Sequence, residues 1–159
     1  MIVKEIRDED FTSYKKPAMV IGFPSCTFKC CKEGNFPIEI CQNCKLAQAN
    51  DIKISVEQIV DRYLSNRITS AIICAGLEPF DSWWDLHDLI IEIRQKTKDD
   101  IVIYTGYQKE EISYAIDWLH LFPNIIVKFG RFIPNQQTHY DEVLGVKLAS
   151  PNQYAEVIS

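Results

Sequence analysis

The stretch Ala18-Met-Val-Ile-Gly-Phe23-Pro24-Ser-Cys26-Thr-Phe-Lys-Cys30-Cys31 joins an uninterrupted apolar run to a cluster of cysteines. The apolar run predicts a strand, and Pro24 ends it. Cys41-Gln-Asn-Cys44 follows, so five of the six cysteines fall within residues 26–44. Thiols grouped in this way are held by disulfides, by a metal or by an iron–sulfur cluster. The cysteines therefore predict a special site directly after the first apolar strand.

Composition and charge restrict the function classes. With 159 residues, 47% of them apolar, we expect one compact domain over residues 1–159. The net charge of −5 and the lack of a basic face exclude nucleic acid as a partner. Met1–Asp10 is too charged for a signal peptide, and no run of residues is apolar enough for a membrane helix. We therefore expect no membrane contact and a cytoplasmic location, where grouped cysteines more often bind metal than form disulfides.

Strand and helix patterns alternate along the chain. Between them lie a cysteine loop of about residues 24–49, which has no periodicity, and a C-terminal tail of about residues 131–159. Such alternation predicts an α/β fold with a parallel sheet and crossover helices, and four strand–helix units are too few for a closed barrel. We expect strands at 18–23, 70–74, 101–104 and 125–128, helices at 56–64, 82–96 and 109–119, and a short edge strand at 1–6.

The unusual residues gather where the predicted strands end. Four segments follow carboxyl ends of strands: the cysteine loop, Gly76-Leu-Glu-Pro79, Thr105-Gly-Tyr107 and Gly130-Arg131. Loops at these ends form the ligand sites of parallel α/β sheets. A ligand site is therefore expected at this rim. The alternative for the last three segments is an ordinary turn between a strand and the next element.

The order of these motifs resembles the radical S-adenosylmethionine (SAM) superfamily. Cys26, Cys30 and Cys41-Gln42-Asn43 fit its pattern of three cysteines after the first strand. Gly76-Leu-Glu-Pro79, Tyr104-Thr-Gly-Tyr107 and Ser150-Pro-Asn-Gln153 resemble, more narrowly, the activating proteins of anaerobic (class III) ribonucleotide reductases. The resemblance covers about residues 18–153 and implies the open, partial βα barrel of that superfamily.

The resemblance also implies a chemistry. Three thiolates on a [4Fe-4S] cluster leave one iron open, and in the superfamily that iron binds SAM, which an electron cleaves to a 5′-deoxyadenosyl radical. The radical would then generate a glycyl radical on a partner, anaerobic ribonucleoside-triphosphate reductase, with flavodoxin or a ferredoxin-type protein as electron donor. The implied metal ligands are Cys26, Cys30 and Cys41, and the implied SAM contacts are Ile40, Gln42, Gly76, Glu78, Thr105 and Gly106.

The third ligand departs from the pattern, because the superfamily usually has two residues between its second and third cysteines and this chain has ten. Cys44 is an alternative to Cys41, which has the Gln-Asn sequel of the pattern. Cys31 is not expected to replace Cys41 as the third ligand, because it is adjacent to Cys30, and adjacent side chains in an extended chain point to opposite sides. Two other functions remain open: a structural zinc module with Cys26, Cys30, Cys41 and Cys44 as ligands, and a radical SAM enzyme acting on a small molecule. Cys74 is expected in the core. Core packing or exposed anchoring explains Trp84, and a partner contact is the alternative, because Trp84 lies off the apolar face of its predicted helix.

Overall fold

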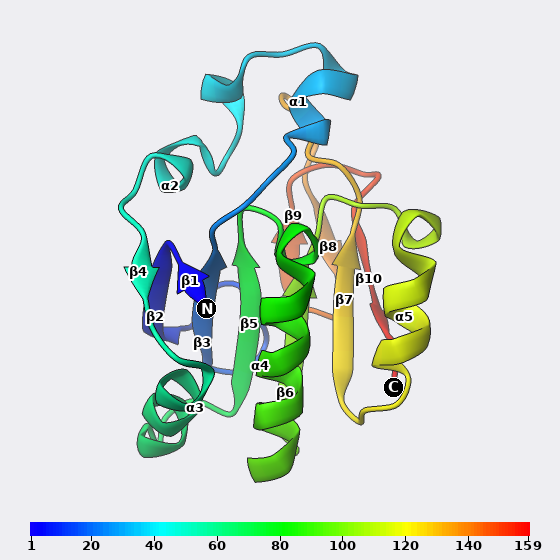
Figure 1. Cartoon of the computed structure of the whole chain (residues 1–159). Helices are drawn as coiled ribbons and strands as arrows, with labels where there is room; N and C mark the ends of the chain where they lie inside the picture. The colour runs from blue at the N-terminus through cyan, green and yellow to red at the C-terminus, as the bar shows by residue number, and fades with distance from the viewer.

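The structure, a computed structural model, describes residues 1–159. Its centre is a six-stranded sheet with the order β10-β7-β6-β5-β3-β2 (Figure 1). The four central strands pair in parallel, whereas β2 and β10 pair antiparallel at the two edges. The fold is therefore α/β with a mixed sheet. The strands are β2 (Glu5–Asp10), β3 (Ala18–Phe23), β5 (Ala71–Gly76), β6 (Asp100–Tyr104), β7 (Ile125–Phe129) and β10 (Tyr154–Val157).

The burial of the strands explains their order. Every residue of β3 and of β7 is buried, as expected for parallel strands covered on both faces. In contrast, β2 has the sequence Glu-Ile-Arg-Asp-Glu-Asp, and charged side chains are tolerated at a sheet edge, where they hinder pairing with other chains. The predicted edge strand at 1–6 is divided, because β1 (Ile2–Val3) pairs instead with β4 (Ile52–Lys53).

Three helices cover one face of the sheet (Figure 1). They are α3 (Val56–Ser65), α4 (Trp83–Lys96) and α5 (Ser113–Leu119). The predicted capping box at α3 is confirmed, because Ser55 and Gln58 exchange side-chain-to-backbone hydrogen bonds of 3.0 and 3.1 Å. The helix predicted at 109–119 begins as a 3-10 turn, η3 (Lys109–Ile112). A core of 24 buried residues, including Cys74, lies between these helices and the sheet.

The segment predicted as a C-terminal tail is ordered. It contains a hairpin of β8 (His139–Asp141) and β9 (Val146–Leu148), followed by β10. The hairpin packs on the second face of the sheet through Leu144 and Leu148, which belong to a smaller core cluster of 10 buried residues. Asp141 fixes the turn, because its two carboxylate oxygens accept the N–H groups of Leu144 and Ala155 at 2.9 Å. These strands are too short and too polar to give a strand pattern.

The cysteine loop lies over the carboxyl ends of the parallel strands, at the top of Figure 1. It contains α1 (Lys29–Gly34), η1 (Ile38–Ile40) and α2 (Cys44–Ala47), each of which is too short to show helical periodicity. The sheet itself stays open, because β2 and β10 are not paired with each other. The radical SAM type of partial barrel stays a prediction.

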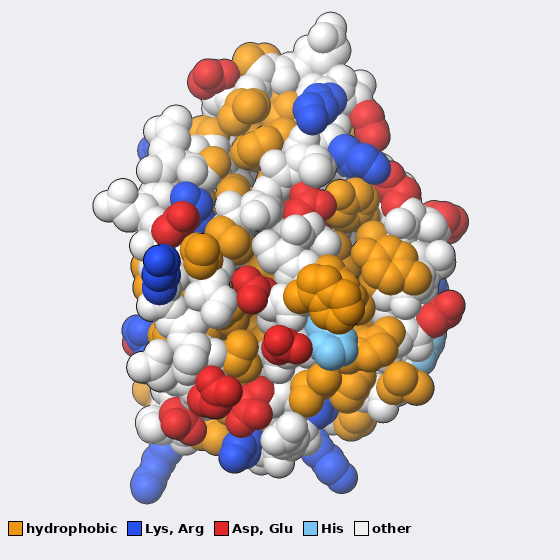
Figure 2. All heavy atoms as spheres, in the orientation of Figure 1, with side chains coloured by type: hydrophobic (Ala, Val, Ile, Leu, Met, Phe, Trp, Pro, Cys, Tyr) orange, Lys and Arg blue, Asp and Glu red, His pale blue; other side chains and the backbone are white.

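Aromatic side chains gather on the outside of α4 and α5, where Figure 2 shows a patch of hydrophobic side chains. The ring of Trp83 packs edge-on against the rings of Tyr114 and Trp118, with centroids 5.7 and 5.3 Å away. Trp84 is 73% exposed at this surface. None of the helices combines the length and the apolar character needed to cross a membrane.

Candidate functional site

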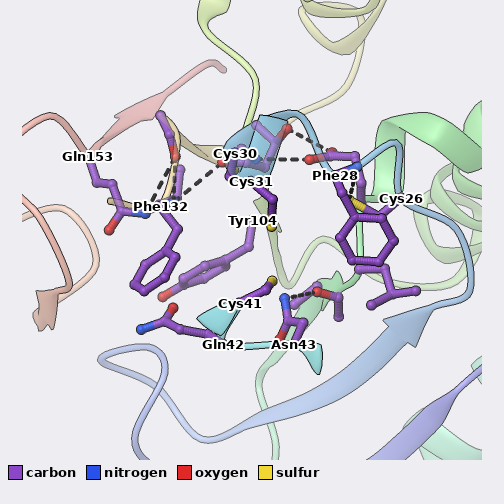
Figure 3. Close-up of a pocket in the computed structure, with 18 of the residues that line it drawn as sticks. Cys26, Phe28, Cys30, Cys31, Cys41, Gln42, Asn43, Tyr104, Phe132 and Gln153 are labelled. Carbon is purple, nitrogen blue, oxygen red and sulfur yellow. Dashed lines mark hydrogen bonds between the residues drawn. The ribbon is translucent and has the colours of Figure 1, made fainter. Parts of the chain in front are cut away.

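A cavity of about 340 Å³ lies between the cysteine loop and the carboxyl ends of β5, β6 and β7 (Figure 3). This is the rim where the sequence places a ligand site. Of the residues predicted at the site, Ile40 alone is not brought to the cavity: it is 48% exposed and lies outside the lining. The predicted residues that do line it are Cys26, Cys30, Cys41, Gln42, Gly76, Glu78, Thr105 and Gly106.

Four cysteines line this cavity rather than three. Cys26 precedes α1, Cys30 and Cys31 lie on α1, and Cys41 lies between η1 and α2. The expectation that Cys31 points away from Cys30 rests on an extended chain, and the chain there is helical, so both side chains reach the cavity. Cys44 begins α2 and is not among the lining residues.

Burial favours the neutral form of three of the cavity thiols, Cys26, Cys30 and Cys31. Burial raises the pKa of Cys26 to about 12, and burial also raises the pKa values of Cys30 and Cys31. The backbone N–H of Phe28 donates to Cys26 Sγ at 3.2 Å, and the backbone N–H of Phe132 partly offsets the rise at Cys30. Metal binding there must displace protons, after which these N–H donors stabilise the thiolates.

An ionic network fixes α1 above the cavity. The Arg131 guanidinium is 8% exposed and donates to the Glu33 carboxylate through Nε and Nη2, at 2.8 and 3.1 Å. It also donates to Glu111 at 2.8 Å and to the carbonyl of Gly106. Lys29 adds a second contact to Glu111 at 2.9 Å. Charges on both sides of Cys30 therefore hold the helix against the loop after β7 and the start of η3.

The end of β5 at Gly76 anchors the second part of the cysteine loop, the segment that contains Cys41. Its φ is +90°, and a Cβ there would lie 2.6 Å from Gly22 Cα, so only glycine fits. The Gly76 carbonyl accepts a hydrogen bond from the Asn43 side chain, which attaches the Cys41-Gln-Asn segment to β5. The Glu78 N–H donates to the Ser25 carbonyl at 2.8 Å. The glycine is thus explained by close backbone packing beside the cavity.

Glu78 joins the ends of two strands. It is 4% exposed; Oε1 accepts from Thr105 Oγ1 at 2.7 Å and from the Phe80 N–H at 3.3 Å, and Oε2 accepts from the Gly106 N–H at 2.9 Å. Burial raises its pKa to about 7 despite these donors. A carboxylate offers about four acceptor positions, so one position on Oε2 is left for a ligand.

Sequence reasoning missed Lys128 and the aromatic lining. Lys128 is buried at the end of β7, and its ammonium donates to the carbonyls of Gly130 and Thr105 at 3.1 and 3.4 Å. Burial lowers its pKa to about 8, which leaves it charged at neutral pH. A lysine inside the apolar run 125–129 was the available signal. The aromatic rings that line the cavity are those of Phe28, Tyr104 and Phe132.

Residues 19–150 match the family model described as a 4Fe-4S single cluster domain. The chain belongs to this family. No curated protein and no solved structure matches the chain. A [4Fe-4S] cluster is bound in proteins by cysteine thiolates, and the cysteine-lined cavity of this chain fits that group.

A structural zinc site agrees less well with this structure than an iron–sulfur cluster does. Thiolates on one tetrahedral zinc lie about 3.8 Å apart, because Zn–S bonds are about 2.3 Å long. No group of three or more His, Cys, Asp and Glu side chains in the structure is placed to hold one metal ion. The four-cysteine zinc site also needs Cys44, which lies outside the cavity. The family match and the cavity both favour iron–sulfur binding.

Proposed function

We propose that this 4Fe-4S single cluster domain is a radical SAM activase, which generates a glycyl radical on anaerobic ribonucleoside-triphosphate reductase. The observation that carries the proposal is that Cys26, Cys30 and Cys41 line one cavity together with Gly76 and Thr105–Gly106. These residues belong to motifs on which the resemblance to the superfamily rests, and they come from three separate strand ends, those of β3, β5 and β6.

The cofactors supply the chemistry. A reduced cluster held by Cys26, Cys30 and Cys41 would supply one electron to cleave the bond between sulfur and C5′ of SAM, which would give methionine and a 5′-deoxyadenosyl radical able to take a hydrogen atom from a glycine of the partner. Flavodoxin or a ferredoxin-type protein is the proposed electron donor. What the chain contributes is a set of groups that bind and orient these cofactors.

The cavity holds groups that complement each part of SAM. The Lys128 ammonium has a third N–H that can donate to the SAM carboxylate, since carbonyls accept the other two. The remaining acceptor position of Glu78 Oε2 suits the amino group, and the rings of Phe28, Tyr104 and Phe132 offer flat apolar surfaces to adenine. The cavity volume of about 340 Å³ falls within the range of small-molecule sites, about 300–1,000 Å³.

A protein substrate needs access from outside the loop. A shallower groove of about 700 Å³ lies along the cysteine loop and shares Cys26, Phe28 and Cys31 with the cavity. Its other walls come from Asn35, Phe36 and neighbouring residues of the same loop. We propose that the glycine-bearing loop of the partner enters along this groove, which leads from the surface to the cluster cavity.

The test is anaerobic reconstitution with iron and sulfide, followed by reduction and addition of SAM. We expect stoichiometric cluster, 5′-deoxyadenosine as product, and a glycyl-radical doublet in the electron spin resonance spectrum when the reductase is added. Cys44→Ala is the matched control, because Cys44 lies outside the cavity. Fully loaded, reduced protein that forms no 5′-deoxyadenosine would remove the SAM part of the proposal. Cleavage without a protein radical would instead indicate a small-molecule substrate.

A further inference from the structure

Cys31 is a cavity thiol for which the three-cysteine pattern has no role. It is 5% exposed and is the one buried residue of the cysteine loop. It lines the cavity together with Cys26, Cys30 and Cys41. Figure 3 shows Cys30 and Cys31 on α1 facing the cavity from the side opposite to Cys41.

The backbone fixes Cys31 in this position. Its carbonyl accepts the N–H groups of both Asn35 and Phe36, and Asn35 ends α1 in a left-handed conformation with φ 51°. Two hydrogen bonds to one carbonyl are a common way in which the last turn of a helix is closed. At the other end, α1 begins after Phe28, which also has a positive φ of 54°. The short helix is therefore closed at its C-terminal end by two hydrogen bonds to Cys31, whose side chain lines the cavity.

We propose that Cys31 is a fourth ligand of the cluster. It binds the fourth iron while no small molecule occupies that position, and the amino and carboxylate groups of SAM displace it. The displacement of Cys31 by SAM rests on the proposed function. The binding of Cys31 to the cluster rests on the family and the cavity alone. A [4Fe-4S] cluster takes four thiolates, one per iron, and four thiols line this cavity.

The exchange is a ligand substitution without electron transfer. When Cys31 binds iron its thiol releases one proton, and when SAM displaces it the thiolate takes one proton up. With Cys31 bound, the cluster has no iron open to water, so it keeps its fourth iron in the absence of SAM.

The test compares wild type, Cys31→Ala, Cys31→Ser and Cys44→Ala after anaerobic reconstitution. Each protein is treated briefly with ferricyanide, and iron content and the electron spin resonance signal of a [3Fe-4S] cluster are measured. We expect wild type and Cys44→Ala to keep four irons and Cys31→Ala to lose one. Circular dichroism checks folding, and Cys31→Ser keeps the side-chain volume in case Cys31→Ala does not fold.

A second measurement tests the displacement. If Cys31 holds the iron in about nine molecules of ten, its removal lowers the apparent Kd for SAM about tenfold, because only the free fraction binds. This Kd is read from the change of the reduced-cluster spectrum on titration with SAM. Equal iron loss or equal iron retention in wild type and the Cys31 variants would overturn the ligand proposal. Selective iron loss in those variants without SAM cleavage by any protein would sink the proposed function and leave the ligand assignment standing.

Discussion

Substitution of Gly76 by alanine tests whether the strand end beneath the cavity depends on close backbone packing. The new Cβ would lie 2.6 Å from Gly22 Cα and 2.8 Å from the Phe23 backbone nitrogen. Neither atom can move freely, because Gly22 and Phe23 belong to β3 and pair in register with Ala75 and Gly76 of β5. The substitution therefore strains two neighbouring strands rather than a flexible side chain.

The expected cost follows from two contributions. A non-glycine residue with left-handed backbone costs about 1–2 kcal/mol, and overpacking a tight site costs about 1–3 kcal/mol. Together they predict a loss of about 2–5 kcal/mol in the free energy of unfolding of Gly76→Ala. For a domain of this size each kcal/mol lowers Tm by about 2–4 °C. The shift in Gly76 also weakens the hydrogen bond from Asn43, so the reconstituted variant should hold less iron.

Urea denaturation of the apoprotein measures the loss. Gly34→Ala is the matched control: its Cβ would meet only the ring of Phe36, a side chain that can turn aside, and its φ is not left-handed. We expect this control to stay within about 1 kcal/mol of wild type. If Gly76→Ala were as stable as Gly34→Ala, the packing argument for the glycine would be refuted.

Three further predictions concern the charges and thiols around the cavity. Because burial raises the pKa of Glu78 from 4.5 to about 7, the folded state binds a proton that the unfolded state has released in this window, so stability falls as pH rises through it. Relative to Glu78→Gln, wild type should lose up to roughly 3 kcal/mol between pH 4.5 and 7 in urea titrations; a constant difference contradicts this. Arg131→Met removes the ion pairs to Glu33 and Glu111 and should cost about 1–3 kcal/mol; a loss below about 0.5 kcal/mol would show that the network is not stabilising. Cys44→Ala should hold as much iron as wild type by metal analysis, and a marked drop would place Cys44 among the ligands.

The central strands could be predicted from sequence because each is a continuous apolar run. Ile125-Ile-Val127 is an example. Both faces of this strand are covered, one by the helices and the other by the β8–β9 hairpin, so all three residues are apolar. The edge strands could not. Glu5–Asp10 is almost entirely charged, and Tyr154–Val157 alternates too briefly to stand out. The antiparallel edges, and hence the mixed sheet, follow from tertiary pairing that no local pattern encodes.

The same division applies to the site. Gly76, Glu78 and Thr105 were placed correctly at one rim because each directly follows a recognisable strand. Cys31 was misjudged, because its direction depends on a helix of six residues, too short to leave a periodic signal. Ile40 was expected at the cavity from its place before Cys41, but the 3-10 turn there exposes it. Side-chain direction in short irregular segments depends on contacts that form only in the folded chain.

The attachment of the cysteine loop has a consequence for cluster assembly. The loop is joined to the rest of the molecule through ion pairs and hydrogen bonds, and Cys31 is its one buried residue. The sheet and helices keep their own core of 24 buried residues without it. We therefore expect the loop to open as a separate unit, with amide hydrogens that exchange with solvent faster than those of the central strands. A cluster can consequently be inserted into, and lost from, a chain that remains folded throughout.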